Sequence, residues 1–167
     1  LISKKRAPIA KKIYEEIGGS SPILKLTKEQ AFELEKSLNF NQRETSYKTF
    51  VVMRCWKPRA SEVINDIKNF ETNEVILLPL YPQFSYSTSG SSINEWKDIC
   101  KKNKYNVKTS TICCYPTEEN FIKAHIDELN KKIGKNNNEK IIFSAHGLPE
   151  KNIKNGDPYQ WQIERTV

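Results

Sequence analysis

The stretch Ile141-Ile142-Phe143-Ser144-Ala145-His146-Gly147-Leu148-Pro149 decides how we interpret the fold of this chain. Its three leading apolar residues predict a short buried strand, and two small residues then lead directly to His146. Gly147 and Pro149 prevent a regular continuation. His146 is therefore expected at the carboxyl end of a sheet strand, which is the edge where α/β folds bind their ligands.

Strand-like and helix-like segments alternate along the whole chain. Segments rich in β-branched and aromatic residues predict strands over 47–53, 74–80, 107–112 and 140–145. Apolar residues at helical spacing predict helices that begin near residues 7, 27, 58, 92, 116 and 157. Because helical crossovers favour parallel pairing, we expect an α/β fold built on a doubly wound parallel sheet.

Two helix ends have their own signals. Gly18-Gly19 is expected to end the first helix. Thr27 and Gln30 have the spacing of a capping box, so the second helix is expected to begin at Thr27.

The distinctive loops all follow predicted strands and should converge on one edge of the sheet. They cover residues 54–56, 79–92, 113–116 and 144–149. The loop over 79–92 joins stiffening prolines, aromatic rings and a run of hydroxyls to a helix N-terminus, which suits a flat aromatic ligand with carboxylates. An ordinary capped turn with packed aromatic side chains would have the same composition. Arg54 and Arg6 could each bind a carboxylate ligand or close a structural salt bridge.

His146 is the main candidate for chemistry, because a neutral imidazole can accept a proton or ligate a divalent metal. A hydrogen-bonded core histidine is the alternative, and the strand-end position favours the working role. No neighbouring residues offer a closed metal cage, so the segment suits transient metal handling. His125 lies within a predicted helix, and we assign it no chemistry.

The composition of the 167 residues fits a soluble globular protein, with 37% hydrophobic and 28% charged residues. No apolar run approaches the roughly 18 residues of a membrane span, and we expect a cytoplasmic protein. The net charge of +7 comes from scattered lysines, so no nucleic-acid partner is expected. The four cysteines lack C-x-x-C spacing and are expected to be reduced. Without a G-x-G-x-x-G or P-loop motif, no phosphate or dinucleotide cofactor is indicated.

Three motifs resemble the ferrochelatase family, in family order and spacing. The first is Gly18-Gly19-Ser20-Ser21-Pro22 with Thr27 and Gln30. The second runs over 78–85, with Ser87, Thr88 and Gly90. The third is Ser144-Ala145-His146-Gly147-Leu148-Pro149, followed by Gly156-Asp157-Pro158-Tyr159. Together they cover nearly the whole chain.

The resemblance implies a chelatase-like fold of two similar Rossmann-like halves and the insertion of ferrous iron into protoporphyrin IX. It assigns His146 to metal binding or to removal of pyrrole protons, two roles that stay open. Positions that it places in the porphyrin pocket are Arg6, Tyr14, Ser21, Arg54, Tyr81 and Ser87. It also leaves open a peripheral contact with the inner membrane.

The chain departs from the family pattern in three respects. The family's first strand would precede Leu1, and its second domain, with an acidic residue facing the histidine, would follow Val167. We therefore expect a fragment, with most of the N-terminal domain over 1–140 and the beginning of the second half over 141–167, inactive by itself.

Tyr86 marks the third departure, because cluster-bearing members have a cysteine ligand there, so we expect no iron–sulfur ligand and no resident cofactor. The alternatives are a cobalt or nickel chelatase of the same fold, or a non-catalytic tetrapyrrole-binding fragment.

Overall fold

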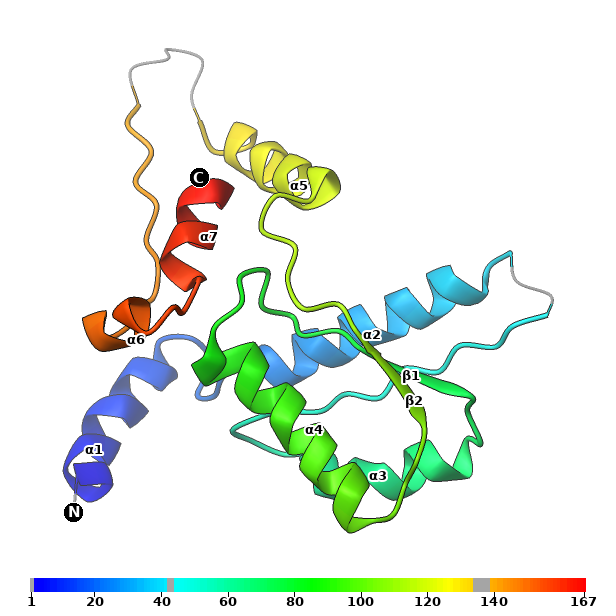
Figure 1. The fold of residues 1–167 in the computed structure, drawn as a ribbon. Helices are drawn as coiled ribbons and strands as arrows, with labels where there is room; N and C mark the ends of the chain where they lie inside the picture. The colour runs from blue at the N-terminus through cyan, green and yellow to red at the C-terminus, as the bar shows by residue number, and fades with distance from the viewer. Residues whose placement is uncertain (1, 42–43, 134–138) are drawn as a thin grey trace. The chain divides into compact units, whose positions relative to one another are not determined.

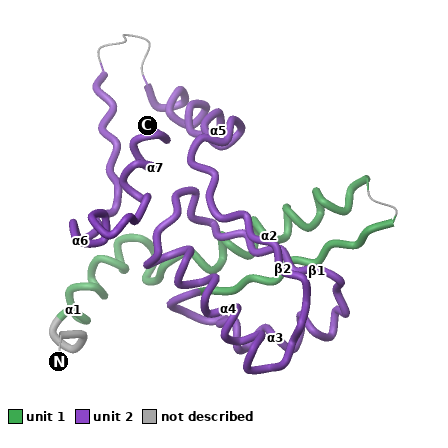
Figure 2. Tube along the Cα trace, in the orientation of Figure 1, with its two compact units in different colours: residues 1–53 green, residues 54–167 purple. Residues whose placement is uncertain are grey.

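Helices and a small parallel sheet make up the computed structural model of this chain, which describes residues 2–41, 44–133 and 139–167 (Figure 1). Contacts divide the chain into two units, residues 1–53 and residues 54–167 (Figure 2). The domain boundary expected near residue 140 stays a prediction. Within the described residues, no helix is both long enough and apolar enough to cross a membrane.

The first unit contains α1 (Ile2–Glu15) and α2 (Ile23–Asn39). The glycine pair ends the first helical segment as predicted: Gly18 and Gly19 have φ angles of 95° and 86°, and the Gly19 N–H donates to the Tyr14 carbonyl at 2.7 Å. Positive φ angles of this kind are the natural conformation of glycine beyond a helix end.

The predicted beginning of the second helix at Thr27 is wrong, because α2 already begins at Ile23. Pro22 is the N-cap residue, and its carbonyl accepts the first helical hydrogen bond from the Leu26 N–H at 3.0 Å. The Ser21 hydroxyl oxygen accepts the Ile23 N–H at 3.3 Å. A proline and a serine hydroxyl together therefore satisfy the helix start, and Thr27 lies inside the helix.

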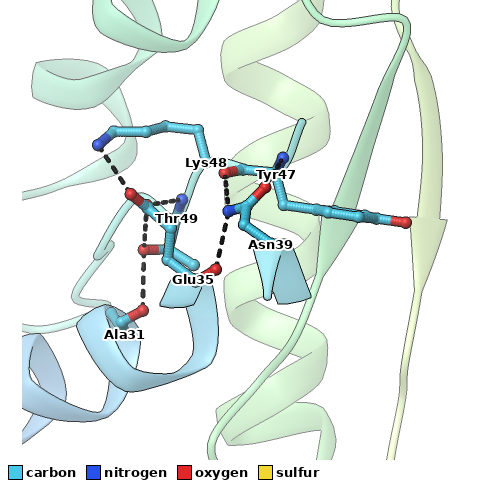
Figure 3. Close-up of polar contacts among 6 residues, drawn as sticks. All are labelled: Ala31, Glu35, Asn39, Tyr47, Lys48 and Thr49. Atoms are coloured by element: carbon cyan, nitrogen blue, oxygen red, sulfur yellow. Dashed lines mark hydrogen bonds and ion pairs between the residues drawn. The ribbon is translucent and has the colours of Figure 1, made fainter. Parts of the chain in front are cut away.

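The strand predicted over 47–53 is not formed. Instead, this segment makes hydrogen bonds with side chains of α2 (Figure 3). Asn39 makes two hydrogen bonds with the backbone of Tyr47, at 2.9 and 3.0 Å. The Glu35 carboxylate accepts the N–H of Thr49 at 2.7 Å and its hydroxyl at 2.9 Å. Side chains of α2 thus bind backbone groups that a neighbouring strand would otherwise take.

The second unit is built on two parallel strands, β1 (Glu74–Leu77) and β2 (Lys108–Thr111), inside the ranges that the sequence predicts. Glu74 lies opposite Lys108 in the register, and their side chains form an ion pair of 2.9 Å. The Ile112 N–H donates to the Leu77 carbonyl at 2.9 Å, so the pairing continues at the carboxyl ends.

Helices α3 (Ala60–Asn69) and α4 (Ser91–Lys102) pack together beside these strands. The buried apolar side chains of the described residues come from these two helices: Ala60, Val63, Ile64, Ile67 and Trp96. The Trp96 indole N–H donates to the Thr109 hydroxyl at 3.4 Å, which joins α4 to β2. The helical spacing of Val63, Ile64, Ile67 and Phe70 predicts one apolar face, and the core contains the first three, whereas Phe70 is 37% exposed.

A turn of π-helix, η1 (Tyr86–Gly90), leads into α4. The sequence predicts only a long turn here. Gly90 allows the tight approach, because a Cβ atom at this position would lie 3.1 Å from Cζ of Phe84. That spacing is closer than ordinary van der Waals contact between carbon atoms.

Three helices complete the second unit: α5 (Glu119–Asn130), α6 (Glu150–Lys154) and α7 (Tyr159–Thr166). The Glu118 side chain accepts the Phe121 N–H at 2.8 Å, which fixes the beginning of α5 just after Pro116. The helix expected near Asp157 is present as α7. The short α6 is not predicted, because Gly147 and Pro149 indicate only a turn.

The doubly wound sheet is not formed in the described part of the chain, whose sheet has two strands. The segment 140–145, predicted as a strand, is extended but makes no ladder, and 88% of the Ile142 side chain is exposed. An extended segment becomes a strand only when a partner supplies the ladder hydrogen bonds. The described fold is therefore mixed α/β with a small parallel sheet.

Candidate functional site

The loop between β1 and α4 is held by a buried carboxylate from the far end of the chain. Asp157 is 5% exposed, and its Oδ2 atom accepts the Ser85 hydroxyl at 2.8 Å and the Tyr86 N–H at 3.0 Å. Its Oδ1 atom accepts the Tyr159 N–H at 3.0 Å, so the same side chain fixes the approach to α7. Asp157 therefore couples the loop to the last helix.

Side chains of helix α7 also form hydrogen bonds with the residues just before Ser85. The Phe84 N–H donates to Oε1 of the buried Gln162 at 2.6 Å, and the Gln83 side-chain amide donates to the Thr166 hydroxyl at 2.8 Å. Consecutive residues from 83 to 86 are thus bound by one segment. A loop held at successive positions presents its remaining side chains in a defined arrangement.

The loop that follows β2 holds the other side of the turn. The Tyr115 N–H donates to the Pro82 carbonyl at 2.8 Å, and its hydroxyl donates to the Pro79 carbonyl at 3.3 Å. Burial raises the pKa of the Tyr115 hydroxyl. The loops that follow the two strands therefore meet at their carboxyl ends, as the parallel sheet predicts.

Tyr81 and Ser87, both predicted to bind a ligand, lie on this loop and are exposed, Tyr81 to 49%. Ser85 and Ser89 are buried instead. The exposed ring of Tyr86 packs edge-on against Phe84, with ring centroids 5.3 Å apart. The loop thus exposes Tyr81, Tyr86 and Ser87 to solvent, and buries Ser85 and Ser89.

Arg54 lies beside the same loop and closes a structural salt bridge there, whereas its binding of a carboxylate ligand stays a prediction. Its Nε atom donates to the Ser91 hydroxyl at 2.7 Å and lies 3.6 Å from the Glu95 carboxylate. Arg59 pairs with the same carboxylate, with its Nε atom 3.0 Å from Oε1. In the described chain, the hydrogen bonds of Arg54 use only Nε, which leaves its two terminal nitrogens available for a carboxylate or another acceptor.

An open groove of about 440 Å³ runs along this cluster. It is lined by Arg54, Arg59, Tyr86, Ser91 and Glu95, together with outer residues of α4. Cationic, hydroxyl and aromatic groups therefore meet in one place. Arg59 and Glu95 are not singled out by the sequence, because an arginine before a helix and a glutamate within it look like surface residues.

His146 lies outside these contacts. It is exposed on the extended segment before α6, and within the described ranges it makes no hydrogen bond or ion pair. Neither a core role nor a site role is tested by this arrangement. The assignment of His146 to proton or metal handling stays a prediction.

The remaining predicted residues belong to the first unit. Arg6 and Tyr14 are exposed on α1, and Ser21 is exposed immediately before α2. Their placement in a common pocket with the loop of the second unit stays a prediction. Among described residues, no three His, Cys, Asp or Glu side chains are grouped so that they could hold a metal ion.

Asp157 and Gln162 are the functional supports that the sequence analysis misses. The motif containing Asp157 is visible in the sequence, but its partner is not, because Ser85 lies 72 positions away. An aspartate that precedes a proline and a helix is usually explained as a local cap. Here it accepts the Tyr159 N–H at the beginning of α7 and also reaches the distant loop.

The chain is similar along its whole length to known proteins. A family model described as Ferrochelatase matches residues 1–167. The ferrochelatase of Pelagibacter ubique (strain HTCC1062) is 65% identical over 167 residues, which cover 100% of this chain and 48% of that protein. A ferrochelatase of Wolbachia is 48% identical over 172 residues, and that of Hyphomonas neptunium is 44% identical over 169 residues, with 99% and 98% of this chain covered. These two matches cover 53% and 46% of the relatives, so the chain spans about half the length of the curated relatives it matches.

Proposed function

This chain belongs to the ferrochelatase family, and from that membership we propose that the whole protein inserts ferrous iron into protoporphyrin IX. The reaction forms protohaem and releases two protons from the pyrrole nitrogens. The observation that carries the proposal is the joining of two family motifs: Asp157 binds Ser85 and Tyr86, and so fixes the loop beside Arg54.

Metallation of a porphyrin makes two chemical demands. The pyrrole protons must leave, and the incoming metal must lose its bound water. We propose that His146 serves one of them, as acceptor of a pyrrole proton or as a transient ligand of iron. Its exposed position on the segment before α6 leaves the imidazole accessible to both.

The residues that we propose to contact the porphyrin offer the groups that it needs. Flat aromatic faces suit the macrocycle, whereas cationic and hydroxyl groups suit its propionates and polar edge. The proposed pocket residues are Arg6, Tyr14, Ser21, Arg54, Tyr81 and Ser87.

We also propose a larger sheet in the whole protein. Segments 47–53 and 140–145 would add strands to β1 and β2, giving the doubly wound, Rossmann-like half of a two-domain chelatase fold. A cytoplasmic location, with peripheral contact to the inner membrane and no nucleic-acid partner, completes this proposal.

No resident cofactor belongs to this proposal, since iron is the substrate. Tyr86 offers a phenol where an iron–sulfur cluster needs a thiolate, and its ring packs on Phe84. We expect the purified full-length protein to lack cluster absorbance. A cluster bound through Cys55, Cys100, Cys113 or Cys114 would contradict this expectation.

The test is a metal-insertion assay on the full-length protein. We expect turnover of protoporphyrin IX with ferrous iron under anaerobic conditions, followed by the change in porphyrin absorbance. Cobalt and nickel, with the same porphyrin, form the comparison. Faster turnover with either metal would favour the alternative chelatase, and porphyrin binding without any turnover would favour a non-catalytic tetrapyrrole-binding protein.

A further inference from the structure

A short chain of hydrogen bonds connects the buried carboxylate to the surface of the loop. The Ser85 hydroxyl donates to Oδ2 of Asp157 at 2.8 Å. The hydroxyl oxygens of Ser85 and Ser87 are 2.8 Å apart, and the Ser87 N–H donates to the Ser85 oxygen at 3.2 Å. Ser85 is 1% exposed and Ser87 is exposed, so the chain runs from the interior to solvent.

The direction of each bond follows from the protons available. A hydroxyl has one proton and two lone pairs, and a carboxylate has only lone pairs. The Ser85 hydroxyl proton is used in the hydrogen bond to Asp157. Toward Ser87, the Ser85 oxygen can therefore only accept a hydrogen bond. The hydroxyl proton of Ser87 must then point inward. Both lone pairs of the exposed Ser87 oxygen then remain available to accept a hydrogen bond.

We propose that Asp157 is a positioning residue which, through Ser85, makes Ser87 a hydrogen-bond acceptor toward the bound tetrapyrrole. This inference rests on the proposed function and specifies one of its contacts. Ser87 then binds a group that carries a proton, either a pyrrole N–H or a water molecule on the incoming metal. It does not bind a propionate carboxylate, which would itself need a donor.

A propionate bond from Ser87 would require its proton to leave Ser85. The Ser85 oxygen would then accept only the Ser87 N–H at 3.2 Å, and two hydroxyl oxygens 2.8 Å apart would have no proton between them, which is unfavourable. Arg54, whose terminal nitrogens are donors, is the better carboxylate partner beside the loop.

The test compares protoporphyrin IX with its dimethyl ester, which keeps the pyrrole N–H groups but has no carboxylate. Dissociation constants of the full-length protein are measured by porphyrin fluorescence in one detergent. If a pyrrole N–H is the donor, Ser87→Ala should weaken the binding of both ligands by the same factor, roughly threefold to tenfold for one hydrogen bond. Weakening confined to the free acid, or no change with either ligand together with an unchanged KM for ferrous iron, would overturn the proposal.

The Ser85→Ala variant tests the direction of the hydrogen bonds in the Asp157–Ser85–Ser87 series. Without the Ser85 hydroxyl, the Ser87 proton is free to face the ligand, so affinity for the free acid relative to the ester should rise roughly threefold to tenfold. Asp157→Ala should shift the ratio in the same direction, and the double variant should add nothing, because Asp157 acts through Ser85. An unchanged ratio in Ser85→Ala contradicts the assigned direction, whether or not Asp157→Ala folds.

Gln162→Ala is the matched control. It removes another buried support of the same loop, the bond to the Phe84 N–H, but leaves the Asp157–Ser85–Ser87 chain intact. It should change both affinities together and leave their ratio constant. A shift of the ratio equal to that of Ser85→Ala would mean that a loosened loop, and not polarity, causes the effect.

Two further measurements identify the donor and separate this inference from the proposed function. Zinc protoporphyrin lacks pyrrole N–H groups. If Ser87→Ala leaves the binding of zinc protoporphyrin unchanged, the contact is assigned to those groups. A raised KM for ferrous iron at saturating porphyrin assigns it to metal-bound water. If the wild-type protein binds porphyrin but inserts no iron, the proposed function fails while the ester comparison still decides the polarity. Absence of porphyrin binding would overturn both.

Discussion

Single residues at the sheet edge have chemistry that their neighbours set. Cys113 and Cys114 follow β2 after one intervening residue, Ile112, and the Gln162 amide donates to Sγ of Cys114 at 3.6 Å. A hydrogen bond with Cys114 raises the pKa of Cys113 from 9.0 to about 11, and burial acts in the same direction. Because the thiolate is the nucleophile and the metal ligand, we expect Cys113 to react slowly near neutral pH although it is exposed.

Alkylation tests this directly. With iodoacetamide, modification of Cys113 should keep increasing with pH beyond 9 and reach half its maximal rate only near pH 11, as followed by peptide mass spectrometry. Cys114→Ala removes the largest cause of the shift, so the profile should move toward lower pH. An unchanged profile in this variant would show that the neighbouring thiol is not the cause.

His146 is the residue that we propose accepts a pyrrole proton or binds iron. In the full-length protein, His146→Ala should reduce iron insertion by at least ~10²-fold, the effect of losing an acid–base group, with porphyrin binding retained. His125→Ala is the control, because that ring lies on α5 and contacts Phe121 through its Nδ1 atom. Near-normal turnover of His146→Ala would remove this residue from the reaction.

At the scale of elements, side chains of α2 decide the conformation of the segment that follows it. Glu35 accepts hydrogen bonds from Lys48 and Thr49, and the Thr49 hydroxyl also lies 3.1 Å from the Ala31 carbonyl oxygen (Figure 3). The backbone hydrogen bond from Thr49 lowers the pKa of the Glu35 carboxyl group, against the opposing effect of burial. The ionised carboxylate is therefore part of the structure of the first unit.

Neutralising this carboxylate should loosen the segment. Glu35→Gln should destabilise the contact by about 1–2 kcal/mol, the scale of a charge-assisted hydrogen bond, and accelerate amide exchange at Thr49. Glu33→Gln is the matched control on the same helix, since its pair with Lys36 spans 3.7 Å with both side chains 66% exposed. Equal exchange rates at Thr49 in the two variants would contradict the assignment.

The stabilisation from the Glu35–Thr49 hydrogen bond should depend on pH in a defined direction. Because folding lowers the pKa of Glu35, its stabilisation is complete above the unfolded value of 4.5 and is lost as the pH falls through the lowered value. Protection of the Thr49 amide should therefore decrease below about pH 4.5 in the wild-type protein. It should vary less with pH in Glu35→Gln.

Local sequence signals predict elements whose partners are close, and fail where the partner is distant. The apolar spacing of Val63, Ile64 and Ile67 predicts α3 and its buried face, and both are present. The composition of 47–53 predicts a strand equally well, but composition does not report that Glu35 and Asn39 bind its backbone. The composition of the loop predicts a candidate ligand site. It does not predict the support from Asp157, because that contact joins residues far apart along the chain.

At the scale of the whole molecule, few apolar side chains of the described residues are buried. The buried ones come from α3 and α4, whereas many large side chains elsewhere in the described chain are exposed, including Phe143, Ile126 and Trp161. Residues 1–167 match only about half the length of the curated relatives. The groups near the loop thus represent one part of a proposed site that has to surround a macrocycle.

Residues 1–167 produced alone should therefore bind protoporphyrin weakly and insert no measurable iron. Catalysis requires the macrocycle to be held while metal and protons move at its centre, and the Arg54 groove is open to solvent. Exposed apolar side chains, with Ile142 at 88%, should also make this polypeptide prone to aggregation, which light scattering would detect. The full-length protein, purified and assayed identically, is the control. Turnover by residues 1–167 within about tenfold of that control, a barrier difference of about 1.4 kcal/mol, would mean that these residues form a complete catalyst.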